Sequence, residues 1–178
     1  MHHPPAIALD FFQRSALEVA PELLGKYLVR QLPDEEILRL PVTEIEVYEG
    51  HEDKASHACR RRTPRNEVMF FAGGYFYVYL CYGVHWMLNI VCNAADYPAA
   101  ILIRGVGEIS GPGRLTRQLR IDRALDRQLA VPGTGLYFAE SEITVESDEI
   151  ERTPRIGIDS VEPAWREKPL RFVWTQSQ

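Results

Sequence analysis

The chain has 178 residues and a formal net charge of −5, with 46% hydrophobic and 25% charged residues. This length suits one domain with a sizeable core, and the composition is ordinary for a globular protein. Because the sequence has no apolar run of about 18 residues, it excludes a membrane-spanning helix.

The beginning of the chain, Met1 to Pro5, lacks the basic start and the apolar stretch of a signal peptide. The three cysteines have no CxxC spacing, which favours free thiols over a disulfide framework or a zinc site. We therefore expect a cytoplasmic protein, associated with the nucleoid if it is bacterial, that is a monomer and binds no metal or other cofactor. We expect a single domain over residues 1–178, with residues 1–9 as a flexible N-terminal segment.

The first predicted element is a helix, whose start is marked by the capping box from Ser15 to Glu18. Pro21 is expected to break this helix or to begin a second short one, and Gly25 to end it. Strands follow over residues 26–31, 37–40 and 43–49, with a turn at residues 33–35. The polar loop over residues 51–66 is long enough to be functional or disordered.

The second half begins with strands over residues 74–82, 85–93 and 99–105, the first two joined at Tyr82-Gly83. Gly111-Pro112-Gly113 predicts the start of a helix through about residue 119, and Asp122 is expected to cap another through about residue 129. A turn at residues 132–135 precedes short strands at 136–139, 143–145, 155–158 and 169–174. These elements predict an α+β fold, a single compact domain with a curved, mostly antiparallel sheet and helices packed outside it.

Glu46 lies on a strand whose alternation places Ile45 and Val47 on one face and Glu46 and Tyr48 on the other. A lone glutamate on a half-exposed strand is most often a solvated acid. Here Glu44 and Tyr48 would both raise the pKa of the Glu46 carboxyl, which is how a general base is tuned. Glu44 itself is expected to be an edge or solvated acid, and two acids on one strand face seldom flank a bond as glycoside hydrolysis requires.

Aromatic residues give the next candidate, because Tyr75, Tyr77 and Tyr79 share one face of their strand. Such residues are common core fillers, but a tyrosine ladder beside a carboxylate also predicts a slot with flat walls that suits a nucleobase. Tyr82 is harder to explain as core because it lies beside a turn glycine. His57 lies in a polar loop, where a lone histidine is usually solvated, and the sequence has no second histidine at metal-ligand spacing.

Two polar residues interrupt apolar strands, Asn89 within residues 86–91 and Arg104 after residues 101–103. Each must find a hydrogen-bond partner, either in a structural network or in a pocket. The segment Gly111-Pro112-Gly113 is a candidate anion seat at the start of a helix, although short Gly-Pro turns are common.

The charge distribution is segregated along the chain. Residues 60–65 carry four arginines and no acid, residues 104–127 carry six arginines against three acids, and residues 140–151 carry six acids and no base. Phosphates respond to the local potential within about 8–10 Å, so a net-acidic chain with one basic face can bind DNA. The alternative for the arginines at 60–62 is a solvated loop.

Several short motifs, taken in this order, point to one known family: Leu23-Leu24-Gly25-Lys26, Glu44-Ile45-Glu46-Val47-Tyr48, His57, Thr63-Pro64-Arg65-Asn66, Tyr77-Val78-Tyr79, Tyr82-Gly83, Asn89-Ile90, Ile103-Arg104, Gly111-Pro112-Gly113 and Lys168-Pro169-Leu170-Arg171-Phe172. With them the chain resembles the alkyladenine (3-methyladenine) DNA glycosylase family, the single-domain type without a helix-hairpin-helix. The resemblance covers about residues 17–172.

The resemblance implies a role for each matching residue in the excision of a base from DNA. Glu46 matches the general base, Arg104 matches an arginine that helps to hold the attacking water, and Ile156 falls where a backbone carbonyl contacts that water. The other implied roles are a sandwich around the flipped base (Tyr48, His57, Tyr79), insertion into the duplex (Tyr82), rejection of the 2-amino group of guanine (Asn89) and contact with the DNA backbone (Arg62, Thr63, Arg65, Gly111, Gly113, Arg114).

The resemblance thus implies an enzyme that acts on double-stranded DNA containing damaged purines. We expect it to excise 3-methyladenine and 7-methylguanine, with hypoxanthine and ethenoadenine as further candidates. We expect a monofunctional enzyme, because none of the lysines has a recognisable Schiff-base setting. The alternatives are a single-strand nucleic-acid binding module without catalysis, which would need no Glu46, and a hydrolase of small nucleosides or glycosides.

Overall fold

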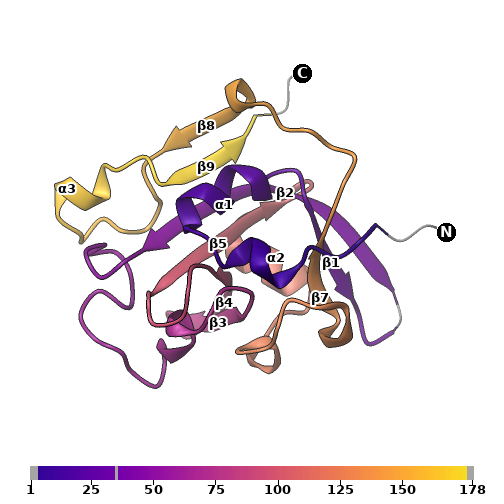
Figure 1. Ribbon diagram of the computed structural model, residues 1–178, viewed down its shortest axis with the longest axis horizontal. Coiled ribbons are helices and arrows are strands. Elements are labelled where there is room, and N and C mark those ends of the chain that lie inside the picture. The colour runs from indigo at the N-terminus through magenta and orange to yellow at the C-terminus, as the bar shows by residue number, and fades with distance from the viewer. Residues whose placement is uncertain (1–3, 35, 176–178) are drawn as a thin grey trace.

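The long strand β2 (Ile37–Glu49) joins the two halves of the sheet in this computed structural model, which describes residues 4–34 and 36–175 (Figure 1). Its first part pairs with β1 (Tyr27–Gln31), which also pairs with β7 (Leu136–Ala139). Its last part lies between β5 (Ala99–Val106) and β9 (Arg171–Trp174). The sequence predicted two strands here; Pro41 lies inside one strand instead.

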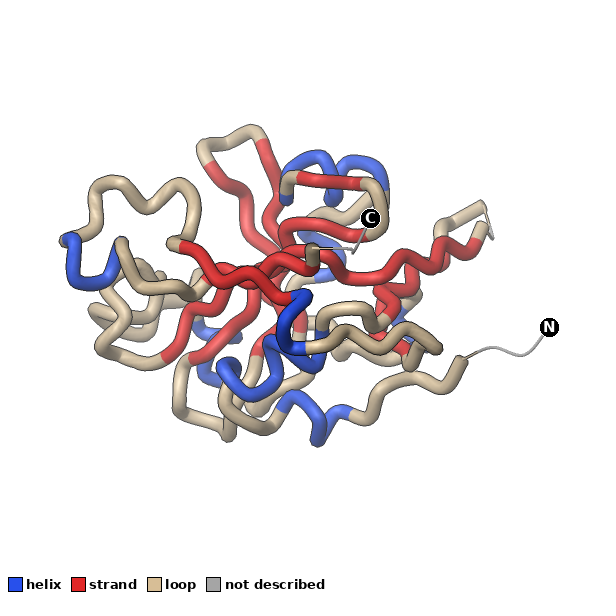
Figure 2. Tube along the Cα trace, turned by 90° about the horizontal axis from the view of Figure 1, so that it is seen from above, coloured by secondary structure: helices blue, strands red, loops and turns tan. Residues whose placement is uncertain are grey.

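The sheet continues beyond β5 through β4 (His85–Val91) to β3 (Phe76–Cys81). Two short strands, β6 (Ile109–Ser110) and β8 (Ile150–Thr153), pair with β5 and β9. Every strand pair formed by the described residues is antiparallel. The strands run through the middle of the molecule and the helices lie around them (Figure 2), which confirms the predicted α+β class.

The helical elements are short. The α-helices are α1 (Ala16–Leu23), α2 (Pro112–Gln118) and α3 (Pro163–Arg166), and the 3-10 turns are Leu9–Phe12, Glu67–Phe70, Arg123–Leu125, Pro132–Thr134 and Ser147–Glu149. No helix in the described part of the chain is long and apolar enough to cross a membrane. The three cysteines are free thiols, as predicted.

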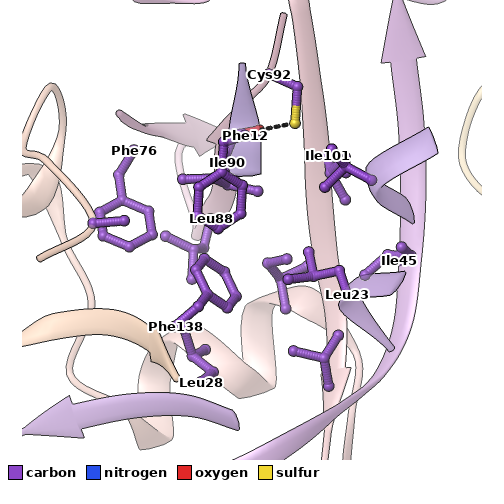
Figure 3. Packing of buried hydrophobic residues seen from close by; sticks show 14 of the residues in the cluster. Phe12, Leu23, Leu28, Ile45, Phe76, Leu88, Ile90, Cys92, Ile101 and Phe138 are labelled. Carbon is purple, nitrogen blue, oxygen red and sulfur yellow. Dashed lines mark hydrogen bonds between the residues drawn. The ribbon is translucent and has the colours of Figure 1, made fainter. Parts of the chain in front are cut away.

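One face of the sheet carries the main hydrophobic core. Ile45 and Val47 point into it from β2, as the alternation predicted, and meet side chains from α1, β4, β5 and β7 (Figure 3). Phe12 and Phe138, whose ring centroids are 5.5 Å apart, are among the fully buried side chains. Since burial of one such side chain contributes about 1.5–3 kcal/mol, this face fixes the sheet rigidly and leaves its other face available for a site.

Helix α1 differs from the prediction in two ways. Pro21 lies inside the helix without breaking it, because Val19, Ala20 and Leu23 are buried against the core and outweigh the one lost hydrogen bond. The cap is Ser15, whose side chain accepts from the Leu17 amide at 3.2 Å. The acid that assists it is Glu49 of β2, not Glu18; Glu49 accepts from the Ala16 and Leu17 amides at 3.2 and 3.3 Å.

The helix predicted after Asp122 is wrong beyond its first turn. Asp122 caps only the 3-10 turn Arg123–Leu125. The chain then follows the edge of β3, where the Arg127 amide donates to the Phe76 carbonyl and the Phe76 amide to the Gln128 carbonyl. Edge pairing therefore replaces helical hydrogen bonds over these residues.

Expectations for two other parts of the chain need correction, and the predicted turn at residues 33–35 is confirmed for the residues described. Residues 143–145 and 155–158 are not strands; the strand in this region is β8, because β9 offers its free edge to residues 150–153. The turn at residues 33–34 is present, whereas Glu35 lies outside the described residues. Residues 4–9 are not free of the domain, since Ile7 is buried and Ala6 bridges to Ala139 of β7; residues 1–3 lie outside the described range.

Candidate active site

A cavity of about 680 Å³ lies on the sheet face opposite the core. The strand register explains its floor, because Tyr77, Asn89, Leu102 and Glu46 form one row across β3, β4, β5 and β2. Tyr77, Asn89 and Leu102 line the cavity, together with the predicted site residues Tyr48, His57, Arg65, Tyr79, Tyr82 and Arg104. A cavity of this size suits a small-molecule or nucleobase ligand.

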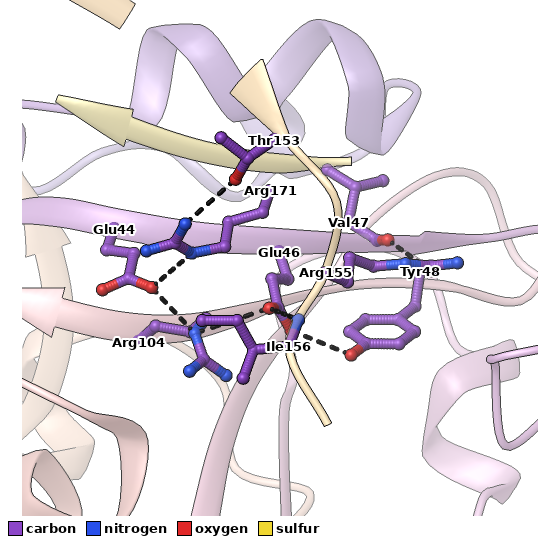
Figure 4. A network of polar contacts seen from close by, with 9 residues as sticks. All are labelled: Glu44, Glu46, Val47, Tyr48, Arg104, Thr153, Arg155, Ile156 and Arg171. Carbon is purple, nitrogen blue, oxygen red and sulfur yellow. Dashed lines mark hydrogen bonds and ion pairs between the residues drawn. The ribbon is translucent and has the colours of Figure 1, made fainter. Parts of the chain in front are cut away.

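Glu46 is completely buried, with 0% of its surface exposed. Its Oε1 accepts a hydrogen bond from the Ile156 amide at 2.7 Å, and its Oε2 accepts one from the Tyr48 hydroxyl at 2.9 Å (Figure 4). Burial raises the pKa of the Glu46 carboxyl, although Arg104 and these two donors oppose the rise. The carboxylate therefore lies directly behind Tyr48, Arg104 and Ile156, which line the cavity, and Glu46 itself does not belong to the lining.

Arg104 owes its position to a β-bulge in β5. Glu44 pairs with Gly105 and Ile45 with Ile103, which leaves Arg104 as the extra residue. Bulges occur next to active sites because they redirect a side chain. The Arg104 Nε lies 2.9 Å from Glu44 Oε1 and 3.5 Å from Glu46 Oε1, so this guanidinium is shared between the two acids.

Glu44 is not the solvated acid that the sequence suggested. It is 8% exposed, and its Oε1 accepts from Arg104 and also from the Nε of Arg171 at 2.7 Å. Arg171 in turn donates to the Thr153 hydroxyl at 2.9 Å (Figure 4). The β2–β9 pairing brings Arg171 beside Glu46 in the register, so this network depends on the C-terminal strand.

The aromatic walls come from three different segments. Tyr48 of β2 and Tyr79 of β3 both line the cavity, and the ring of His57 meets that of Tyr79 edge to face, with centroids 4.7 Å apart. His57 Nδ1 lies 2.9 Å from the Tyr77 hydroxyl. Partial burial and the cationic Arg65 lower the pKa of His57, so its imidazole is neutral near pH 7. Burial raises the pKa of Tyr77 to about 12, so this phenol keeps its proton.

The motif Thr63-Pro64-Arg65-Asn66 closes the loop that carries His57. The Asn66 side chain donates to the carbonyls of His57 and Arg61 at 2.8 and 3.0 Å and accepts from the Thr63 amide at 2.7 Å. Arg65 then lies over the Tyr79 ring, 5.3 Å from its centroid, and donates to the Leu80 carbonyl. This motif therefore shapes the cavity wall, a structural task that the sequence did not reveal.

Asn89 is 4% exposed, and its Nδ2 donates to the Tyr77 carbonyl at 3.1 Å. This bond fixes the amide, so that the side chain stands rigidly in the cavity floor. The sequence left open whether Asn89 belongs to a structural network or to a pocket. It does both, because it bonds to the Tyr77 carbonyl and also lines the cavity.

Tyr82 stands at the tip of the β3–β4 hairpin and is 92% exposed. Tyr82 and Gly83 have φ values of 50° and 68°, and the Val84 amide donates to the Cys81 carbonyl at 3.1 Å. Two central residues with positive φ are typical of a type I′ turn. The ring therefore projects from a short, rigid hairpin at the rim of the cavity.

Of the residues expected to contact the DNA backbone, Arg65 lines the cavity, whereas Arg62, Thr63, Gly111, Gly113 and Arg114 lie outside its lining. Arg114 is exposed at the start of α2, whose Pro112 lines the cavity. A Cβ on Gly113 would meet the His85 ring at 2.8 Å, so close packing explains that glycine; Gly111 has a φ of 101°. Arg62 lies 3.6 Å from Glu67 and 3.4 Å from Asp96, which partly occupies its charge.

No sequence motif pointed to the buried pair of Asp53 and Arg155 or to the position of Lys54 beside the cavity. Asp53 and Arg155 form a bidentate ion pair at 2.6 and 2.9 Å beneath Tyr48. Lys54 lines the cavity, as do Arg65 and Arg104, whereas the lining formed by the described residues contains no Asp or Glu. The sequence carries no local signal for the buried pair, because its members are 102 residues apart.

Comparisons with known proteins show to which family the chain is similar. The family described as methylpurine-DNA glycosylase matches residues 10–110 and 107–178. A protein of Psychrobacter cryohalolentis is 37% identical over 93% of this chain and 90% of its own length, and one of Methanocella arvoryzae is 41% identical over 94% and 92%. Both are named "Putative 3-methyladenine DNA glycosylase", as is a protein of Streptomyces avermitilis that is 40% identical over 84% of this chain and 79% of its own. The chain belongs to the methylpurine-DNA glycosylase family.

Proposed function

We propose that the protein excises alkylated purines such as 3-methyladenine and 7-methylguanine from double-stranded DNA by hydrolysis of the N-glycosidic bond, leaving an abasic site. The observation that carries this proposal is the buried Glu46 carboxylate with a raised pKa behind an aromatic cavity. Family membership supports the DNA glycosylase class, and the names of the relatives support a methylated substrate.

The target base must leave the duplex because its glycosidic bond is out of reach within the stack. Tyr82 is placed to enter the vacated position, since it projects from the rim of the cavity that would receive the base. Stacking of the ring on a neighbouring base contributes about 1–3 kcal/mol and offsets part of the cost of unstacking.

Inside the cavity, Tyr48 and Tyr79 supply the faces between which a flat base fits. A purine alkylated at N3 or N7 is cationic and is attracted to an electron-rich ring by about 1–2 kcal/mol when water is excluded. Asn89 is held in the cavity floor by its bond to the Tyr77 carbonyl, which supports a role in opposing an extra exocyclic amino group. The rings therefore favour an alkylated, cationic base, and Asn89 disfavours any base with a 2-amino group, so 7-methylguanine should be excised more slowly than 3-methyladenine.

Glu46 acts as the general base for the attacking water. Each carboxylate oxygen can accept two hydrogen bonds, so Oε2 retains one lone pair beyond the bond from Tyr48. Arg104 and Ile156 separate the carboxylate from the cavity, and a small shift of the half-exposed Ile156 side chain admits the water. The alkylated base is already a good leaving group, so activation of the nucleophile is the main requirement.

Water rather than an amine is the proposed nucleophile, although the exposed Lys54 lines the cavity. Glu46 has a buried, donor-lined position that suits a base, whereas Lys54 has an exposed one. Borohydride added during turnover should therefore trap no covalent enzyme–DNA adduct. An adduct that forms with the wild type but not with Lys54→Ala would show that the Lys54 amine, not water, attacks the sugar.

The test of the proposed function compares Glu46→Gln with the wild-type protein on a duplex containing one 3-methyladenine or 7-methylguanine. The wild-type protein should release the free base, and E46Q should bind the duplex but release none, because Gln preserves the shape and loses the basicity. E46Q with wild-type excision would refute the role of Glu46. A wild-type protein that binds single strands and releases no base would favour a binding module.

A further inference from the structure

We infer that Arg155, anchored by Asp53, is the positioning residue that aligns the general base and the aromatic wall for the reaction. This inference rests on the proposed function and adds a residue pair that the motifs did not assign. The Arg155 side chain is 0% exposed and that of Asp53 is 1% exposed, so the pair lies entirely beneath the site.

The first contact of Arg155 fixes the aromatic wall. The centre of its guanidinium lies 4.6 Å from the centroid of the Tyr48 ring. Tyr48 lines the cavity and the buried Arg155 does not, so the guanidinium supports the ring from the side away from the ligand. A stacked guanidinium is planar and attractive to the ring face, and it therefore holds the ring parallel to a base on the other face.

The second contact fixes the general base. Arg155 is followed by Ile156, whose amide donates to Glu46 Oε1 at 2.7 Å. The Arg155 Nη1 also donates to the Val47 carbonyl at 2.9 Å, on the strand residue next to Glu46. The Arg155 guanidinium therefore fastens the 154–158 segment to β2 and holds the Ile156 amide within hydrogen-bond distance of the Glu46 carboxylate (Figure 4).

The third contact extends to the loop that carries His57. The Asp53 carboxylate accepts hydrogen bonds from Arg155 Nη1 and Nη2 at 2.6 and 2.9 Å, and a third from the Ala55 amide at 3.1 Å. One guanidinium thus joins β2, the 51–57 loop and the 154–158 segment, which bear Tyr48, His57 and Ile156. The Arg155 Nε has no hydrogen-bond partner among residues 4–34 and 36–175, so hydrogen bonding alone does not explain why the pair is buried.

The arrangement should be visible in the pH dependence of excision, because Glu46 must be ionised to accept a proton. Removal of Arg155 takes away a positive charge and releases the Ile156 amide, and both changes favour the protonated carboxyl. The other charged or titratable groups that face Glu46 stay in place: Arg104 from β5, Tyr48 and Glu44 from β2, Tyr79 from β3, and Arg171 from β9 through Glu44. The acidic limb of the rate profile should therefore move to higher pH.

The experiment measures single-turnover release of the alkylated base against pH for Arg155→Met and Arg155→Lys. Misplacement of about 1 Å costs up to about 100-fold in rate, so R155M should be slower by about that factor near neutral pH, with its acidic limb displaced upwards. R155K keeps the charge and the fold but loses the planar fork, and it should show the same displacement to a smaller extent. R155K serves as the test if R155M does not fold.

Arg30→Met is the matched control. Arg30 is a buried arginine, 9% exposed, that donates to the carbonyls of Leu119, Arg120 and Gly135 and has no atom in the cavity lining. R30M should lose stability but keep the wild-type limb. An R155M protein that is merely slower with an unmoved limb, or an R155K protein identical to the wild type, would overturn the inference. A wild-type protein that releases no base would instead overturn the proposed function.

Discussion

The role of Tyr82 can be isolated by the substitution Tyr82→Asn, which removes the ring and improves the turn. Tyr82 is 92% exposed, so the truncation removes no packing from the fold. Its φ of 50° is unfavourable for tyrosine but readily adopted by asparagine, and Asn-Gly is a preferred pair for type I′ turns. We therefore expect Y82N to unfold at the same temperature as the wild type or a few degrees higher, with a gain of up to about 1 kcal/mol.

The loss in DNA binding should be large by comparison. Stacking of the ring contributes about 1–3 kcal/mol, which corresponds to a loss of about 5- to 150-fold in affinity for a duplex that carries a flipped nucleotide. The assay is fluorescence anisotropy with a duplex that contains an abasic-site analogue, at fixed salt because phosphate contacts make affinity salt-dependent. Thermal unfolding of the same preparation shows that the hairpin is intact.

A single-stranded substrate provides the internal control. An alkylated base in a single strand leaves no stack to be filled, so Y82N and the wild type should excise it at equal rates. Equal affinity of both proteins for the lesion duplex would refute the insertion of Tyr82. A rate loss on the single strand as large as that on the duplex would show that the ring acts on the base itself.

Three more predictions concern the cavity. Tyr48→Phe keeps the ring but removes the hydroxyl that donates to Glu46 Oε2 at 2.9 Å. The acidic limb of the pH–rate profile for excision should therefore move to higher pH, with about tenfold slower excision on that limb. An unmoved limb would show that this hydrogen bond does not stabilise the ionised carboxylate. Glu46→Gln should raise the unfolding free energy at pH 7, measured by urea titration, because it removes the penalty of a buried carboxylate. The pKa of Glu46 is higher in the folded protein than in the unfolded chain, so ionisation of Glu46 destabilises the fold only above the unfolded pKa. A stability difference between E46Q and the wild type that persists at acidic pH would show that the buried charge is not its cause. Asn89→Ser should increase excision of 7-methylguanine relative to 3-methyladenine, because only the guanine carries the 2-amino group that Asn89 opposes. The released bases are measured, and an unchanged ratio would remove Asn89 from selection.

The sequence predicted the sheet better than the segments around it. Strict alternation in residues 43–49 placed Ile45 and Val47 in the core and Glu46 on the opposite face, as the structure confirms. The failures lie where tertiary contacts override local signals. Pro21 stays inside α1 because the helix is held by its buried face, and the helix expected after Asp122 is replaced by pairing along β3.

Asn89 and Arg104 were candidates because each interrupts an apolar strand, and both line the cavity. The β-bulge that directs Arg104 has no local signal, because it arises from the register between β2 and β5. The Asp53–Arg155 pair escaped for the same reason. Its members are 102 residues apart and meet only when the loop after β2 and the segment after β8 close over the same strand.

The choice of Glu46 rather than Glu44 as the base follows from how the guanidinium groups are distributed. Glu44 has Arg104 at 2.9 Å and Arg171 at 2.7 Å, and Asp53 has Arg155 at 2.6 Å. Glu46 is more deeply buried than Glu44, yet its closest guanidinium contact is the shared Arg104 at 3.5 Å. Burial raises the pKa of the Glu46 carboxyl, and its incomplete pairing with guanidinium groups leaves this rise only partly opposed. The network therefore neutralises two of three neighbouring carboxylates and leaves the third, the one behind the cavity wall, able to accept a proton from water.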